Sequence, residues 1–172
     1  MKTYTFLFFL FGALSIGACG IISDTDSTEI ILDDYTVSIE YETANFGDTD
    51  RIADLYEGRT LKIGNEKPPV FTSDTNLLSG SGYVYGGAHT MWLRRGLKDT
   101  DHWYLLFNRN TESTEYNQDY NDTILPLRYS KNPATVEELS INLTGSGEEG
   151  TLAIMWGVHR FEMDLELPPS RN

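Results

Sequence analysis

The residues best suited to chemistry are scattered along this chain of 172 residues. The three histidines, His89, His102 and His159, lack the i, i+4 or His/Cys spacing of a zinc site. Histidines in such positions are usually found in turns or on the surface, and we expect the same here. The sequence therefore predicts no metal site and no cofactor.

The acidic, glycine-rich and serine-containing segments also lack a complete catalytic motif. Two acidic clusters offer oxygen ligands for calcium, but neither has the mid-point glycine and terminal glutamate of an EF-hand loop. These clusters are Asp48, Asp50 and Asp54, and Asp119, Asn121 and Asp122. The glycine-rich segment 80–87 misses the phosphate-loop spacing, so a flexible loop is expected there. Ser79, Ser81 and Ser146 lack a G-x-S-x-G elbow. No catalytic residue is predicted, although the many carboxylates leave a glycosidase pair open.

Aromatic side chains near expected loops give the one positive indication of a binding site. Tyr83 and Tyr85 are two residues apart, so they face the same way in an extended segment. Trp103, Tyr116 and Tyr120 lie in or beside expected loops. Exposed aromatic rings with asparagine and aspartate nearby can stack on sugar rings. We take these five residues as candidate ligand-binding residues, with a role in the core or in stiffening the sheet as the alternative.

The single cysteine, Cys19, has a distinctive position. Lys2 precedes an apolar run over residues 6–14, which is too short to span a bilayer as a permanent helix and fits a signal peptide. The residues Ile16, Gly17, Ala18 and Cys19 then resemble the lipobox of bacterial lipoproteins. The resemblance implies cleavage before Cys19 and lipidation of its thiol and new amino group, palmitate included. A plain secretory signal with an incidental cysteine is the alternative.

The expected lipid anchor also bears on location. Two or three acyl chains hold a protein stably in a membrane, where one chain is marginal. Gly20 follows the cysteine, and an aspartate at this position would signal inner-membrane retention in diderm bacteria. The resemblance therefore favours a lipid-anchored protein of the bacterial cell envelope, in the outer membrane.

The charge of the chain argues against some partners. It has 13 Lys and Arg against 26 Asp and Glu, for a net charge of −13. Such a surface repels phosphate backbones, which attract proteins mainly through lysine and arginine. We therefore expect no nucleic-acid partner, and membrane contact through the lipid on Cys19 only. Solubility on a crowded membrane surface accounts for the acidity.

The hydrophobic pattern predicts three segments: a signal peptide over 1–18, an acidic flexible tether over 19–34, and one domain over 35–172. Alternation of apolar and polar residues predicts strands from residue 35 onward, most clearly over 139–143, 152–156 and 161–167. Residues 49–57 are expected to form one short helix that ends at Gly58. Many short strands with at most one short helix predict an all-β fold, an antiparallel β-sandwich of the jelly-roll or immunoglobulin-like type.

A set of structural motifs between about residues 69 and 167 resembles a family of bacterial envelope proteins. These are a glycine-led strand (Gly87, His89, Trp92), a tryptophan strand (Trp103, Asn108), Glu115–Tyr116, an aspartate-led strand (Asp122, Leu125), and strands at Glu138–Ile141 and Leu152–Trp156. The family is domain-of-unknown-function family twenty-nine eleven. The resemblance implies a β-sandwich in the cell envelope, and no reaction.

Three hypotheses about function follow. The first is a non-catalytic, membrane-anchored binding module for glycan or another envelope protein. The second is a structural envelope component without a small ligand. The third is a hydrolase with an unrecognised carboxylate site. A contiguous exposed patch that contains Tyr83, Tyr85 and Tyr116 would favour the first hypothesis. Carboxyl groups that converge in a deep cleft with shifted pKa values would favour the third, and a smooth surface without concavity would leave the second.

Overall fold

The computed structural model describes residues 24–47, 50–80, 82–97 and 102–169, so Cys19 and the expected signal peptide lie outside the described residues. The described chain forms ten β-strands and one 3-10 turn. The elements are β1 (Thr25–Leu32), β2 (Tyr35–Glu42), β3 (Thr60–Lys62), β4 (Val70–Ser73), β5 (Leu77–Ser79), β6 (Gly82–Val84), β7 (Gly87–Arg95), β8 (Trp103–Asn108), η1 (Gln118–Tyr120), β9 (Asn121–Ser146) and β10 (Glu149–Glu166). Within these ranges no helix is long and apolar enough to cross a membrane.

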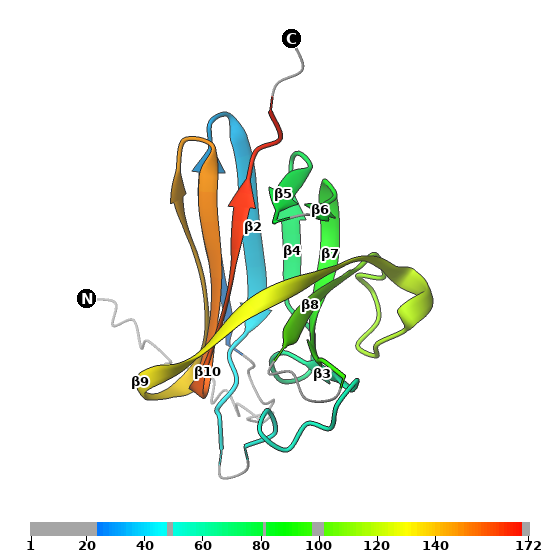
Figure 1. Cartoon of the computed structure of the whole chain (residues 1–172), viewed down its shortest axis with the longest axis vertical. Helices are drawn as coiled ribbons and strands as arrows, with labels where there is room; N and C mark the ends of the chain where they lie inside the picture. The colour runs from blue at the N-terminus through cyan, green and yellow to red at the C-terminus, as the bar shows by residue number, and fades with distance from the viewer. Residues whose placement is uncertain (1–23, 48–49, 81, 98–101, 170–172) are drawn as a thin grey trace, which may run out of the picture.

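All ten strands belong to one antiparallel sheet that is not closed (Figure 1). Its strand order is β1-β2-β4-β7-β8-β9-β10-β5-β6, and β3 pairs with β7 beside this path. The inward side chains of the neighbouring strands β7, β8 and β9 join one core cluster with those of β10. The predicted all-β class is therefore confirmed.

The longest strands, β9 and β10, form one hairpin that bends sharply at its middle (Figure 1). Residues 155–159 of β10 lie opposite the longer segment 131–140 of β9, with two register shifts. Gly157 has a φ of 61°, which an L side chain rarely adopts. Asn132 Nδ2 donates hydrogen bonds to the carbonyl oxygens of Gly157 and His159, at 3.1 and 2.9 Å, and so ties the bend together. The sequence pattern predicted separate strands over 152–156 and 161–167 because the apolar alternation breaks at this bend.

The segment 25–32 differs from the expected flexible tether. It forms β1, whose eight residues all pair with β2. Leu32 is fully buried, and Asp33, at a φ of 49°, turns the chain into β2. The backbone N–H of Asp33 donates to the carbonyl oxygen of Gly147 at 2.9 Å. Thr28, Ile30 and Leu32 are the more buried residues and alternate with exposed ones, so the polar composition of the segment hid a half-buried alternation.

The short helix expected over residues 49–57 is wrong. Asp50 begins a single turn, in which its carboxylate accepts from the Ala53 N–H at 2.8 Å and its carbonyl from the Asp54 N–H at 3.0 Å. The helical hydrogen bonds do not continue beyond this turn. The carbonyl oxygen of Leu55 instead accepts a hydrogen bond from Arg95 Nη1 at 2.9 Å. Helix nucleation is unfavourable over so few residues, and tertiary hydrogen bonds replace it. Asp48 and Thr49 lie outside the described residues.

The glycine-rich segment 80–87 is also more ordered than expected. Its residues Gly82–Val84 form β6, which pairs with β5, and Val84 is fully buried. The three-residue length of both strands gives too little alternation for a sequence pattern to register. The predicted flexible loop is therefore wrong over these residues.

Candidate functional site

Of the five candidate aromatic residues, Trp103 lies in the core. It is the first residue of β8 and is only 5% exposed. Its ring packs edge-on against Phe161, with centroids 5.0 Å apart, and lies 5.9 Å from Tyr129. The Arg95 guanidinium covers it at 5.9 Å. The expectation that Trp103 presents a stacking face to a ligand is therefore wrong, because the ring is the inward residue of a strand.

Tyr83 and Tyr85 are exposed, at 46% and 48%. Tyr83 lies in β6 at the end of the strand order, and Tyr85 follows that strand. Their exposure agrees with the expectation that they face the same way. Neither tyrosine lines the hollow that contains Tyr116 and Tyr120. The structure therefore separates the candidate tyrosines into two pairs.

Tyr116 and Tyr120 meet in a shallow hollow of about 660 Å³ beside the segment that joins β8 to β9. We call it the loop hollow. Its other lining residues are polar: Asn110, Ser113, Glu115, Asn117 and Gln118. Tyr120 is 45% exposed, and Tyr116 is half-buried. Two aromatic rings with amide, hydroxyl and carboxylate groups beside them offer both stacking and hydrogen bonding to a polar ligand.

Tyr116 is held from behind by the sheet. Its ring lies 5.5 Å from that of Trp92, with an angle of 59° between the planes. Its hydroxyl accepts hydrogen bonds from Arg94 Nη2 at 2.8 Å and from Asn121 Nδ2 at 2.6 Å. Trp92 Nε1 in turn donates to the Thr90 hydroxyl at 3.1 Å. The ring therefore has a fixed position before any ligand arrives, which lowers the entropy cost of binding.

Asn108 fixes the backbone of the same loop. This buried residue ends β8, and its Nδ2 donates to the Asn117 carbonyl oxygen at 2.7 Å. Its Oδ1 accepts from the Asn110 N–H at 3.0 Å. A further backbone bond joins the Arg109 N–H to the Tyr120 carbonyl oxygen at 2.9 Å. The side-chain amide of Asn108 thus connects the two ends of the loop. The sequence did not predict this role, because an asparagine at the end of a strand has no distinctive pattern.

Two of the histidines are buried, contrary to expectation. His159 is 5% exposed, and its Nε2 donates to Asp50 Oδ2 at 2.9 Å. In the neutral imidazole, this arrangement leaves Nδ1 to accept from the Tyr129 hydroxyl at 3.0 Å. Burial raises the pKa of Asp50, but hydrogen bonds from the Ala53 N–H and from His159 outweigh it, and the net pKa is lowered. Both ring nitrogens are used, so His159 holds strands together and activates no nucleophile.

His89 forms the second buried pair and is 3% exposed. Its Nε2 lies 3.1 Å from Asp122 Oδ2, and Arg109 Nε lies 3.3 Å from the other oxygen of that carboxylate. The Nδ1 atom is buried without a hydrogen-bond partner. His89 alternates with the inward residues Met91 and Leu93, and this alternation was the signal for its burial. His102 is exposed, as expected.

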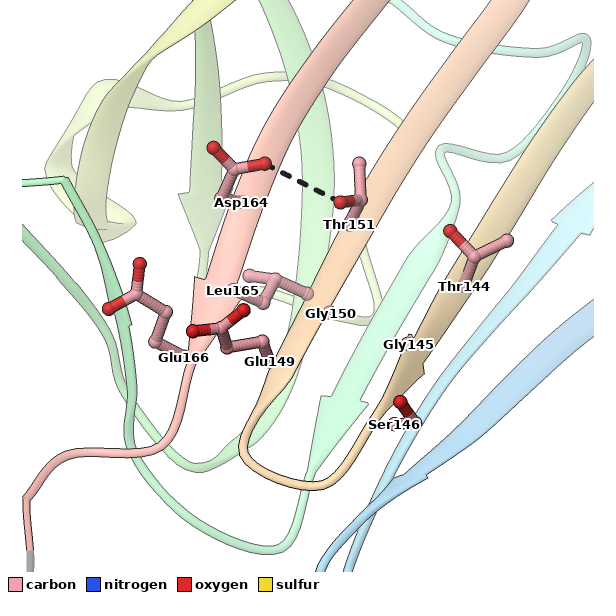
Figure 2. A pocket seen from close by; sticks show the side chains of 9 residues that line it. All are labelled: Thr144, Gly145, Ser146, Glu149, Gly150, Thr151, Asp164, Leu165 and Glu166. Atoms are coloured by element: carbon pink, nitrogen blue, oxygen red, sulfur yellow. Dashed lines mark hydrogen bonds between the residues drawn. The ribbon is translucent and has the colours of Figure 1, made fainter.

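A separate acidic groove lies at the free end of the β9–β10 hairpin (Figure 2). Glu149, Asp164 and Glu166 line it, and Asp164 Oδ1 accepts from the Thr151 hydroxyl at 3.4 Å. The hydrogen bond from Arg128 lowers the pKa of Asp164, which keeps this carboxylate ionised. An ionised, arginine-paired carboxylate cannot act as the general acid of a glycosidase. Asp164 is therefore not a candidate for the general acid in this groove.

Within the described ranges, no group of three or more His, Cys, Asp or Glu side chains is arranged to hold a metal ion. Comparison with known proteins adds no family assignment: no protein family, no curated protein and no solved structure matches this chain. The loop hollow is thus the candidate site that the geometry itself favours.

Proposed function

We propose that this chain is a membrane-anchored bacterial lipoprotein whose folded domain is a non-catalytic binding module for glycans. The observation that carries the proposal is the loop hollow, in which Tyr116 and Tyr120 lie among amide and hydroxyl groups. Sugar rings have an apolar face that stacks on an aromatic ring and hydroxyl groups that bind amides. The fixed position of Tyr116 supports a preformed site, as binding modules commonly have.

The anchoring part of the proposal rests on the sequence alone. Residues 16–19 support lipidation of Cys19, and Gly20 supports the outer membrane as the destination. Replacement of Cys19 by alanine should abolish acyl labelling and release the protein from membranes. Continued anchoring of this variant would contradict the proposal.

The fold proposal is finer than the all-β class. We propose that the bent sheet is an antiparallel β-sandwich of the jelly-roll or immunoglobulin-like type, in line with the resemblance to family twenty-nine eleven. The single core between the two halves of the bent hairpin and the remaining strands supports it. Comparison with the first experimental structure of a protein from that family would test this assignment.

The glycan proposal is tested by an array and pull-down screen on the chain from Gly20 onward. This chain keeps every described strand and the whole core, whereas a start at Asp34 would remove β1. Tyr120→Ala should weaken the binding of any retained glycan about tenfold, which corresponds to about 1.4 kcal/mol. Tyr35→Ala is the matched control, because Tyr35 is equally exposed, at 43%, and lies outside the hollow. Absence of glycan binding, or an equal effect of both substitutions, would contradict the proposal.

A further inference from the structure

Two asparagine side chains that line the loop hollow, those of Asn110 and Asn117, are held in fixed orientations. The Oδ1 atom of Asn110 accepts a hydrogen bond from the Glu112 N–H at 3.3 Å. The Oδ1 atom of Asn117, which caps η1, accepts from the Asp119 N–H at 2.9 Å. Asparagine commonly binds the backbone two residues on in this way. Because each amide oxygen is bound to the backbone of its own loop, the orientation of each amide plane is set.

The fixed orientation leaves the other end of each amide for a ligand. An asparagine amide has one acceptor oxygen and an Nδ2 group with two N–H donors. In the described part of the chain, no protein acceptor binds the Nδ2 atom of Asn110 or that of Asn117. The loop hollow therefore presents oriented N–H donors, which complement a hydrogen-bond acceptor on the ligand.

The backbone positions of these two asparagines are fixed as well. Asn108 accepts from the backbone N–H of Asn110 and donates to the backbone carbonyl oxygen of Asn117, so one buried side chain binds both residues. The carbonyl oxygen of Asn110 also accepts from the Thr90 hydroxyl of β7 at 3.3 Å. The donors of the hollow are therefore in place before a ligand arrives, which lowers the entropy cost of binding.

Two other groups of the hollow extend this complementarity. Glu115 supplies a carboxylate, which accepts hydrogen bonds and repels a ligand of negative charge. Tyr120, which is 45% exposed, supplies an aromatic ring on which a methyl group or the face of a sugar ring can pack. The hollow thus combines oriented N–H donors, a carboxylate acceptor and an aromatic surface.

We propose that the loop hollow selects sugars that carry an acetamido group, as N-acetylhexosamines do. This inference rests on the proposed glycan-binding function and names the class of sugar. The acetamido carbonyl oxygen accepts from the asparagine Nδ2 donors, its N–H donates to the Glu115 carboxylate, and its methyl group packs on Tyr120. A sugar with hydroxyl groups alone has neither the carbonyl oxygen nor the methyl group, and Glu115 repels a uronic acid.

The test is a calorimetric titration of the chain from Gly20 onward with three β-1,4-linked trisaccharides that differ only in the substituent at carbon 2. The trimers of N-acetylglucosamine, glucosamine and glucose carry an acetamido, an ammonium and a hydroxyl group there. We expect the N-acetylglucosamine trimer to bind about tenfold more tightly than each of the others, which corresponds to about 1.4 kcal/mol.

The other outcomes separate this inference from the proposed function. Equal binding of the glucose trimer, or no binding of the N-acetylglucosamine trimer, would overturn the acetamido inference. Tighter binding of the glucosamine trimer would also overturn it, because the charge of Glu115 would then decide the selectivity. In each case the retention of any other glycan on the array would leave the glycan-binding proposal standing, whereas an array without any binding would overturn both.

Two substitutions locate the selectivity in the loop hollow. Asn110→Asp and Asn117→Asp each keep the oxygen that accepts from the loop backbone and replace the Nδ2 donors by a second oxygen. At least one of them should reduce the preference for the N-acetylglucosamine trimer over the glucose trimer from about tenfold to about threefold or less. Asn65→Asp is the matched control, because Asn65 is exposed and lies outside the hollow. An unchanged preference in both hollow variants, or the same reduction in Asn65→Asp, would refute the inference.

Discussion

Arg94 Nη2 donates a hydrogen bond to the Tyr116 hydroxyl over 2.8 Å, and the guanidinium carbon lies 5.8 Å from the centre of the same ring. This pair joins β7 to the loop between β8 and β9. It also ties the loop hollow to the sheet, because Tyr116 lines that hollow and Arg94 belongs to β7. The position of the proposed glycan-stacking ring therefore depends on a side chain of the sheet.

Tyr116→Phe should destabilise the fold by about 1–2 kcal/mol, because it leaves the Arg94 and Asn121 donors without their shared acceptor. The ring itself remains, so a glycan that stacks on it should still bind. Urea unfolding measures the stability, and a glycan titration measures the binding. Tyr83→Phe is the control, because Tyr83 is exposed, at 46%, and away from this network. An equal loss of stability in both variants would contradict the assigned role of the hydroxyl.

The sequence predicted most of the strands of this fold but little of the loop hollow. Apolar alternation over residues 37–41 and 139–143 reports directly which side chains face the core, and the structure agrees. Alternation does not report which strand pairs with which, so the burial of Trp103 by Phe161 was not predictable. An aromatic residue near an expected loop has the same sequence signal whether its ring faces outward or inward.

The structural features that the sequence did not predict share one physical cause. Contacts between residues distant in sequence determine each of them. Asp50 could have capped a helix, but its carboxylate pairs with His159, which is distant in sequence. The polar segment 25–32 could have remained a spacer, but it pairs with β2 along its whole length. Tyr116 and Tyr120 were recognised as candidates by type, whereas Asn108, which orders their loop, has no local signature.

Gly157→Ala should destabilise the fold by about 2–3 kcal/mol or more, because a Cβ atom there would lie 2.3 Å from the Phe46 ring. The control is Gly147→Ala. Gly147 has nearly the same φ, 62° against 61°, but its Cβ would have no atom within 4 Å. The difference between the two variants in urea unfolding therefore isolates the steric clash from the backbone strain. Phe46→Ala combined with Gly157→Ala should recover part of the loss, and equal effects of the two glycine substitutions would contradict this packing at the bend.

Removal of β1 should strongly destabilise the domain. A chain that begins at Asp34 loses all eight pairs with β2 and the fully buried Leu32, and β2 then becomes an exposed edge. Loss of a buried leucine alone costs about 2–5 kcal/mol. A chain that begins at Asp24 is the control, because it keeps the strand. The two chains are compared by urea unfolding and by light scattering for aggregation, and equal stability would show that β1 adds nothing to the fold.

The Asp50–His159 pair makes the stability of the domain depend on pH. The pKa of Asp50 is lowered in the folded state from its ordinary value of 3.8, because its hydrogen bonds outweigh the effect of burial. A carboxylate with a lowered folded pKa stabilises the fold above its unfolded pKa. This contribution is lost as the pH falls through the folded pKa.

The substitution Asp50→Asn tests this dependence, because the amide keeps an oxygen for the Ala53 N–H but carries no charge. We expect the wild type to be more stable than Asp50→Asn at about pH 6, with the difference shrinking steadily below about pH 4. Urea unfolding at a series of pH values measures both proteins. Asp34→Asn controls for the general effect of removing one negative charge, since Asp34 is exposed on the β1–β2 turn. A difference between wild type and Asp50→Asn that stays constant down to about pH 3 would show that the carboxylate charge does not stabilise this pair.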